Sequence, residues 1–340
     1  MKVAILTFHN SPNNAGAVLQ AWALQRVLEK LGHEVFIIDY HRKRGDKNKW
    51  WGFGSLAGVY YTVKRFPLEM LRQSRCDAFR RRHLNLTPSE YGGRVQYRDA
   101  DAFITGSDQV FNPVHNEMNP DFLLDFVPSG RRRISYGASF GTNDFNAEYR
   151  EMLKTCLTKF DALSVREESG ALTIKNIAGL DALVALDPVL LLDADEYKPL
   201  MSDSASATPS VVPYVFVYVI GQHPDALRMA LEKAKETDAK RIVVMTNARA
   251  EWQWPHKGIV RRIGIFTPAD FLVYIANAAH VVTNSFHGTA FSVIFGRKFT
   301  SLRNGTAGDD RMATLLKAKE ARTLDAMREK SISFLNMVLS

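Results

Sequence analysis

Short apolar runs alternate with helical patterns along the chain, an order that predicts parallel sheets covered by helices. The first unit has a strand over 3–8, a polar loop over 9–16 and a helix over 17–31 whose apolar residues recur at helical spacing. Gly32 ends that helix, and a second apolar run over 35–38 follows. A strand, a helix and a strand in this order are typical of the opening of a doubly wound domain.

The same alternation continues along the chain, with one break in composition. Small polar residues and prolines fill 201–213, which indicates a linker between domains. We therefore expect an α/β protein with two Rossmann-like domains, over 1–200 and 214–320, facing each other across a cleft, and a final helix over 321–340. The later strands are expected over 102–105, 134–136, 163–165, 214–220, 242–245 and 279–282, and the helices over 148–160, 169–177, 224–236, 267–277, 289–295 and 311–319.

One stretch near the C-terminal end carries the polar residue to which we give most weight. Asn284, Ser285 and Gly288 supply turn and capping chemistry between an apolar strand and an apolar helix. His287 is expected in this turn, at the carboxyl end of a strand, where open α/β sheets bind ligands. Free amides at a helix start favour an anion, and a histidine beside it can transfer protons near neutral pH. The alternative is that His287 only caps the helix or fills a gap in the core.

Two more polar side chains follow predicted strands. Asp108 lies in the sequence GSDQ, where a carboxylate could accept a proton from a hydroxyl group or could cap a turn. Arg166 follows the strand over 163–165, and a planar guanidinium binds carboxylate or phosphate through two hydrogen bonds. An ion pair with Glu168 is the structural alternative, since Glu167 is expected to face the opposite way.

The loop before the first helix is similar to a phosphate-binding loop but has no G-x-G-x-x-G fingerprint. Asp39, at the end of the second strand, could contact a ribose as in dinucleotide sites, but the missing fingerprint disfavours this interpretation. We instead expect Asn14, Gly16 and Gln20 to shape a loop that contacts substrate.

The composition is ordinary for a globular protein, because 46% of the 340 residues are hydrophobic and 24% are charged. The two cysteines, Cys76 and Cys156, do not suggest a disulfide framework, which favours a reducing cytosol. The first ten residues predict a strand and not a signal peptide, and no apolar run approaches the length of a membrane span. No cluster of His and Cys has metal-ligand spacing, so we expect no structural zinc, and a loosely bound magnesium stays open.

The net charge of +8 favours anionic partners, and one segment is unusually basic. Residues 41–83 begin HRKRGDKNK, continue WWGFGSLAGVYY and end in RRRH, so that basic and aromatic side chains interleave. An amphipathic segment of this kind could lie on an anionic membrane surface. It could equally be a lid over the active site joined to a solvated basic helix, whereas nucleic-acid binding is not supported by any recognised module.

Six stretches together resemble the polysaccharide pyruvyl transferase family. They occur in the order expected for that family and span most of the chain, although Phe111 stands where relatives often carry Trp. The six are NNAGAVLQAWALQ at 13–25, FITGSDQVFNP at 103–113, ISYGASFG at 134–141, LSVREESG at 163–170, LDPVLLL at 186–192 and TNSFHGTAFSVIFGRKF at 283–299.

The resemblance implies a GT-B-like arrangement and an activity. Enzymes of this family transfer pyruvate from phosphoenolpyruvate to a sugar, often as a cyclic ketal on two hydroxyl groups. The implied acceptor is a sugar of a bacterial exopolysaccharide or capsule, or its polyprenyl-diphosphate-linked precursor, held by the N-terminal domain with the donor on the C-terminal domain. We expect no cofactor beyond the co-substrate phosphoenolpyruvate, no nucleic acid, and a cytoplasmic protein that the basic segment could bring to the inner face of the membrane.

The resemblance and the positions at strand ends together give the candidate residues their roles. His287 is the candidate acid or phosphate partner, and Asp108 is the candidate base for the acceptor hydroxyl. Arg303 and Arg311 are placed only by their position after the signature helix, and each could be a surface residue. The expected donor-binding residues are Arg166, Ser285, Phe286, Gly288, Arg303 and Arg311, and the expected acceptor-binding residues are Asn14, Gly16, Gln20 and Gln109.

Two other functions stay open on the sequence. The same fold serves glycosyltransferases that use a nucleotide sugar, although no clear acidic ribose ligand follows the signature helix. A basic anion-binding protein without catalysis would bind with strong salt dependence and release no phosphate. A histidine in a turn, with arginines at separate strand ends, favours an enzyme.

Overall fold

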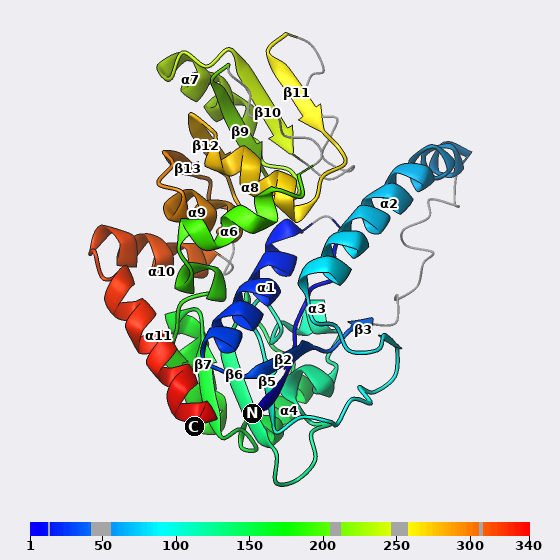
Figure 1. Cartoon of the computed structure of the whole chain (residues 1–340), viewed down its shortest axis with the longest axis vertical. Coiled ribbons are helices and arrows are strands. Elements are labelled where there is room, and N and C mark those ends of the chain that lie inside the picture. The colour runs from blue at the N-terminus through cyan, green and yellow to red at the C-terminus, as the bar shows by residue number, and fades with distance from the viewer. Residues whose placement is uncertain (13, 42–55, 205–211, 246–257, 306–308) are drawn as a thin grey trace.

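The computed structural model describes the chain except for residues 13, 42–55, 205–211, 246–257 and 306–308 (Figure 1). Much of the basic segment that starts at 41 and most of the expected linker over 201–213 therefore lie outside the described residues. Two larger sheets, one formed before residue 200 and one after it, contain only parallel strands. This is the α/β class with two Rossmann-like sheets that the alternating pattern predicts.

The N-terminal sheet has six strands in the order β2-β1-β5-β6-β7-β8. Two short strands, β3 (Tyr40–His41) and β4 (Glu90–Tyr91), fall between β2 and β5 in the sequence and form a separate two-stranded sheet. The six strands are β1 (Lys2–Leu6), β2 (Glu34–Ile37), β5 (Ala102–Thr105), β6 (Arg132–Ala138), β7 (Ala162–Val165) and β8 (Leu183–Val184). The helices of this part are α1 (Ala15–Lys30), α2 (Leu56–His83), α3 (Pro113–Asn116), η2 (Pro120–Leu123), α4 (Ala147–Leu157), α5 (Glu168–Ala178), η3 (Pro188–Leu191) and α6 (Ala194–Met201).

The C-terminal sheet has five strands in the order β11-β10-β9-β12-β13. The sequence did not predict β11, whose apolar residues flank two arginines in VRRI at one edge of the sheet. The strands are β9 (Tyr214–Tyr218), β10 (Arg241–Met245), β11 (Val260–Ile263), β12 (His280–Thr283) and β13 (Phe299–Ser301). The helices are α7 (Ala226–Glu236), α8 (Pro268–Ala276), α9 (Phe286–Ile294), α10 (Asp309–Glu320) and α11 (Leu324–Leu339).

Local capping chemistry sets where the C-terminal helices begin. Thr267 caps α8 with Pro268 at its first position, as the sequence predicts, and a capping box with Asp270 reinforces it. Helix α9 begins at Phe286, three residues earlier than the predicted 289, because Oγ of Ser285 accepts from the backbone N of Gly288 at 3.4 Å. The prediction that His287 lies in the turn before the helix is therefore wrong, since His287 belongs to the first helical turn.

The two sheets share one hydrophobic core. It includes residues of β1 and α1 from the N-terminal part together with residues of β9, α8 and α9. Tyr197 of α6 joins them, with ring centroids 5.3 Å from Trp22 and 5.0 Å from Phe291. Helix α11 returns to the N-terminal part, where Oγ of Ser331 accepts from the backbone N of Leu186 at 3.0 Å. Among the described helices, none combines the length and apolar character that a transmembrane span requires.

Candidate active site

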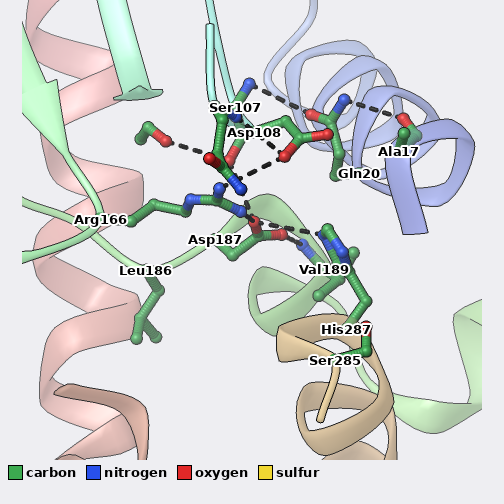
Figure 2. A network of polar contacts seen from close by, with 12 residues as sticks. Ala17, Gln20, Ser107, Asp108, Arg166, Leu186, Asp187, Val189, Ser285 and His287 are labelled. Carbon is green, nitrogen blue, oxygen red and sulfur yellow. Dashed lines mark hydrogen bonds and ion pairs between the residues drawn. The ribbon is translucent and has the colours of Figure 1, made fainter. Parts of the chain in front are cut away.

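The switch points of both sheets supply the candidate polar side chains. Chain order reverses between β1 and β5 in the N-terminal sheet and between β9 and β12 in the C-terminal sheet. Open α/β sheets bind ligands outside the carboxyl ends of their strands at such points. Asp108 follows β5 and His287 follows β12, and both side chains lie in one polar network (Figure 2). The meeting of two switch points identifies this network as the candidate site.

Asp187 connects the two halves of the network (Figure 2). Its Oδ2 pairs with Nη1 of Arg166, accepts a hydrogen bond from Oγ of Ser107 at 3.0 Å and lies 3.6 Å from Nε2 of His287. Its Oδ1 accepts from the backbone N of Val189 at 3.1 Å. Arg166 therefore pairs with Asp187 and not with Glu168, the alternative that the sequence left open.

Asp108 lies at the tip of the turn after β5, in the left-handed region with φ of 67°. Non-glycine residues adopt this conformation rarely, and such positions cluster at functional sites. Its Oδ1 accepts from the backbone N of Gln109 at 2.8 Å and lies 3.6 Å from Nη2 of Arg166. The carboxylate thus stabilises its own turn, as the capping alternative holds, and also borders the Arg166 guanidinium.

Gln20 fixes the position of this turn relative to α1. The two hydrogens of its Nε2 are shared among three acceptors, which are Oγ1 of Thr7 at 3.0 Å, the carbonyl of Phe8 at 3.0 Å and the carbonyl of Ala17 at 2.8 Å. Its Oε1 accepts from the backbone N of Ser107 at 3.1 Å. Because both ends of the amide are engaged within the protein, the expected contact between Gln20 and an acceptor would require one of these bonds to break.

His287 packs directly on Gly16 across the boundary between the two sheets. A Cβ atom added at Gly16 would lie 2.2 Å from Nδ1 of His287, far inside contact distance. Glycine at 16 therefore permits a close approach of α1 and α9, which is a packing role beyond the substrate loop expected from the sequence. Asn14, also expected there, caps α1 by accepting from the backbone N of Ala17 at 3.3 Å.

Arg311 of α10 also joins the cluster. When the side-chain amide of Gln109 is oriented with its oxygen toward Arg311, that oxygen accepts hydrogen bonds from Nη2 and Nη1 of Arg311 at 3.0 and 3.1 Å. The guanidinium of Arg166 lies 5.0 Å from the ring centre of Phe286. Four residues expected at the site, Arg311, Gln109, Arg166 and Phe286, are thus near one another. The side chain of Arg303 is exposed, so the structure does not bring it into this cluster.

Asp39 belongs to a separate buried cluster. Its carboxylate pairs with Arg80, accepts from Oγ of Ser89 at 2.6 Å and lies 3.1 Å from ring nitrogens of His9 and His41. These contacts occupy both carboxylate oxygens inside the protein. The ribose contact that the sequence disfavoured would therefore need this cluster to open.

The electrostatics of the site follow from burial and from the ion pairs between buried groups. Burial alone would raise the pKa of Asp187, but the Arg166 guanidinium and the His287 ring together hold that pKa well below its usual range. Burial and, to a smaller extent, the neighbouring Arg166 guanidinium lower the pKa of Arg311. Because burial is the larger cause, an anion in contact with Arg311 would stabilise its charged form.

Several buried polar atoms at the site have no hydrogen-bond partner among the described residues. These include Nη2 of Arg166 and Nε2 of His287, whose residues are only 3% and 5% exposed. Both residues are buried at the meeting of the sheets. Buried nitrogens without a hydrogen bond are rare in folded proteins, and a carboxylate oxygen lies 3.6 Å from each of these two.

Sequence reasoning missed Asp187 and Ser107. Asp187 was visible only as a charged residue inside the apolar run LDPVLLL, a pattern that fits a buried counter-ion as well as a turn. Ser107 precedes Asp108 in the GSDQ corner, and its Oγ also donates to the carbonyl of Gly137 at 3.1 Å. Among the described residues, no group of three or more His, Cys, Asp or Glu side chains is placed to hold a metal ion.

Two Rossmann-like sheets whose switch points meet at one buried polar network define a protein of the GT-B-like class. The sequence profile of the polysaccharide pyruvyl transferase family matches residues 14–306. The chain belongs to this family, whose name implies a transferase of pyruvyl groups with a polysaccharide acceptor. No curated protein sequence matches the chain.

Solved structures with related architecture show low sequence identity. The UDP-GlcNAc 2-epimerase of Methanocaldococcus jannaschii is 14% identical, with 94% of this chain and 92% of that chain covered and a TM-score of 0.48. The UDP-GlcNAc 2-epimerase of Neisseria meningitidis is 11% identical, with 100% and 99% covered and a TM-score of 0.49. The spinosyn rhamnosyltransferase SpnG is 11% identical, with 100% of both chains covered and a TM-score of 0.42. The strand orders of the chain itself define its fold.

We expect the Asp187→Asn variant to be destabilised by about 3–5 kcal/mol, because the buried Arg166 loses its closer carboxylate partner and keeps Asp108 at 3.6 Å. An Asp in an unfolded chain has a pKa near 3.9, and the folded pKa of Asp187 is lower. Its stabilising effect is thus fully present above the unfolded pKa and is lost as the pH falls toward the folded pKa. Melting temperatures from pH 7 down to pH 3 should therefore fall less steeply in the variant than in the wild type. Asp181→Asn, at an exposed pair with Lys175, serves as control and should change little.

The Gly16→Ala variant separates helix propensity from the contact with His287. Alanine in a helix is favoured over glycine by about 1 kcal/mol, so propensity alone predicts a more stable protein. We expect the reverse, because the new Cβ would collide with the His287 ring. In a His287→Gly background, which also removes the Cβ atom of residue 287 that lies 2.6 Å from the new one, the same change should stabilise, and a thermal double-mutant cycle measures the difference. Equal effects of Gly16→Ala in both backgrounds would show that the contact is unimportant.

Proposed function

We propose that the protein transfers the pyruvyl group of phosphoenolpyruvate to a sugar of a surface polysaccharide, or of its lipid-linked precursor, and forms a pyruvate ketal. Family membership supports the class of reaction. The single observation that supports the donor is the pair of buried nitrogens, Nη2 of Arg166 and Nε2 of His287, that have no hydrogen-bond partner among the described residues. Phosphoenolpyruvate is small and carries close to three negative charges at neutral pH, which suits such a site.

Two guanidinium groups and a helix start support an anionic donor. Arg166 contacts the carboxylates of Asp187 and Asp108, and Asp187 also lies 3.6 Å from Nε2 of His287. Arg311 adds a further positive group, and the amide oxygen of Gln109 is its neutral partner. The first amides of α9 lie at the start of a helix, where anions are stabilised. In this proposal Arg166 and Arg311 bind the carboxylate and phosphate of the donor.

The proposed reaction balances with the two substrates alone. The methylene carbon of the donor takes a proton, which makes C2 electrophilic, and a sugar hydroxyl adds to C2 and loses its proton. Phosphate then leaves with the electron pair of its bond to C2, and a second hydroxyl adds and loses its proton to close the ketal. Of the two hydroxyl protons, one replaces the proton delivered to the methylene carbon and the other leaves on phosphate.

His287 and Asp108 take the proton-transfer roles in this proposal. His287 Nε2 is the candidate acid for the methylene carbon or the partner of the leaving phosphate, with Asp187 as the group that orients its ring. Asp108 is the candidate base for the acceptor hydroxyl, beside the Arg166 guanidinium. The acceptor would approach from the loops after β1 and β5, where Asn14 lies. A polyprenyl-diphosphate-linked acceptor would place the reaction at the inner face of a membrane.

Donor choice can be tested by thermal melts. Phosphoenolpyruvate should raise the melting temperature, because a ligand that binds only the folded state stabilises it. UDP- and GDP-sugars should leave it unchanged. Stabilisation by a nucleotide sugar alone would instead assign the site to a glycosyltransferase. If phosphoenolpyruvate stabilises the protein but no glycan of a lipid-linked and soluble panel stimulates phosphate release, the protein is an anion-binding protein without this activity.

The roles of His287 and Arg166 predict different kinetic defects. His287→Ala should lower kcat by roughly two to four orders of magnitude while changing donor affinity less, because proton transfer is lost. Arg166→Lys should chiefly weaken phosphoenolpyruvate binding, because an ammonium cannot reproduce the guanidinium fork. Steady-state kinetics measure both, with melts to correct for stability, since Arg166 is buried against Asp187.

Matched controls for these two variants come from positions outside the cluster. His33 precedes β2 at the opposite end of the sheet, so His33→Ala should leave the kinetics unchanged. Arg303 is exposed, so Arg303→Lys should not weaken donor binding. A folded and fully active His287→Ala protein would contradict the assignment of the acid. Capping does not explain a loss at this position, because Ser285 caps α9.

A further inference from the structure

One face of α2 exposes apolar side chains next to arginines. Phe66, Met70 and Leu71 are 49%, 56% and 43% exposed, which is high for such side chains. In Figure 1, α2 projects at the edge of the molecule, with its N-terminal half away from the two sheets. The exposed residues follow helical spacing and form one stripe, which we call the α2 face: Phe66, Pro67, Met70, Leu71, Ser74, Ala78, Arg81 and Arg82.

The opposite side of α2 is anchored, which fixes the direction in which the α2 face points. Arg72 is fully buried and donates from Nε to the backbone carbonyl of Gly264 in the C-terminal part. Arg80 is 2% exposed and pairs with Asp39. Because these contacts come from both sheets, the helix cannot turn its apolar stripe inward without breaking them.

The positive charge of the protein is concentrated in one stretch of its sequence. Residues 42–83 contain twelve Lys and Arg against three Asp and Glu, a net charge of +9. Since the whole chain carries +8, the remaining residues together carry −1. Residues 42–55 of this stretch lie outside the described residues, and Arg72 and Arg80 are buried, so Arg81 and Arg82 are the basic residues that the α2 face itself presents.

We propose that the α2 face docks on an anionic phospholipid surface, with Phe66, Met70 and Leu71 in the boundary between headgroups and acyl chains and Arg81 and Arg82 on lipid phosphates. The side chain of Arg82 is 70% exposed, although Nη1 pairs with Asp203 at 2.9 Å. An amphipathic helix binds in this way through buried apolar area together with attraction to anionic headgroups. This deepens the proposed function by naming the surface that would present a lipid-linked acceptor. Exposed methionine and leucine side chains favour a bilayer over a nucleic acid, whose non-specific affinity comes mainly from phosphate contacts.

The anchored side of α2 leads toward the candidate active site. Sγ of Cys76 lies 3.8 Å from the backbone carbonyl of Ser11, in the loop between β1 and α1. That loop ends at α1, where Gly16 contacts His287. A bilayer bound to the α2 face would therefore lie one helix away from the loop through which the acceptor is proposed to approach.

Vesicle co-sedimentation tests the proposal on the full chain without donor or acceptor. Vesicles of phosphatidylcholine with phosphatidylglycerol should bind the protein at low salt, and vesicles of phosphatidylcholine alone much less. Binding should weaken as salt rises, because exposed charges are screened. The Arg81→Gln/Arg82→Gln variant should bind roughly 30-fold more weakly, since each basic residue at an anionic surface contributes about 1 kcal/mol.

Apolar variants separate insertion from charge. Met70→Ser/Leu71→Ser should bind anionic vesicles more weakly without any change in net charge. The control Leu172→Ser/Met337→Ser removes two side chains of similar exposure, 61% and 68%, on α5 and α11 and should bind like the wild type. Melting temperatures verify that all variants are folded.

Three results would overturn the proposal. The first is equal binding to anionic and neutral vesicles, and the second is unchanged binding in the α2 variants. The third is a dimer in solution that Met70→Ser/Leu71→Ser converts to a monomer. This third result would assign the α2 face to a second copy of the chain. Since the assay contains no phosphoenolpyruvate, failure of the proposed transfer reaction leaves this result intact. Loss of vesicle binding likewise leaves phosphate release with a soluble glycan unaffected.

Discussion

The buried carboxylate of Asp187 is the constraint on which the candidate site depends. An ionised carboxylate inside a protein is costly unless it is paired and hydrogen-bonded. Here Arg166 pairs with it, Ser107 and the Val189 amide donate to it, and His287 lies 3.6 Å away. These partners come from the ends of different strands and from both sheets. Satisfying one carboxylate therefore fixes the turn after β5, the end of β7 and the start of α9 relative to one another.

The same arrangement brings two guanidinium groups to the meeting of the sheets. Arg166 contacts both Asp187 and Asp108, and Arg311 donates to the amide oxygen of Gln109. Donors held rigidly in a buried site need little reorganisation when an anion enters, which is the general basis of electrostatic preorganisation. The proposed donor would complete the hydrogen bonding of Arg166 and His287 without displacing Asp187. A site built this way discriminates by charge and size, and its stability depends on the same ion pair as its binding.

Helix α2 extends this dependence from the site to the surface. Its buried arginines contact the C-terminal part at Gly264 and the Asp39 cluster at the end of β2. The helix therefore bridges the two sheets on its inner side while its outer side stays exposed. A partner on the α2 face would act on an element already bonded to the loop that precedes α1. Binding of a membrane to the α2 face could therefore affect the loop before α1, through which the acceptor is proposed to approach.

The sequence by itself determined the α/β class, most strand positions and the importance of polar residues at strand ends. Buried parallel strands are continuous apolar runs, and turns require particular residues, so both are local properties. Only the tertiary structure decided the partners. Asp187 and Arg166 are 21 positions apart, and Gly16 meets His287 from the other sheet, so no local pattern could pair them. It likewise placed Arg311 in the site and Arg303 outside, because the packing of α10 and not spacing along the chain sets which arginine is near Gln109.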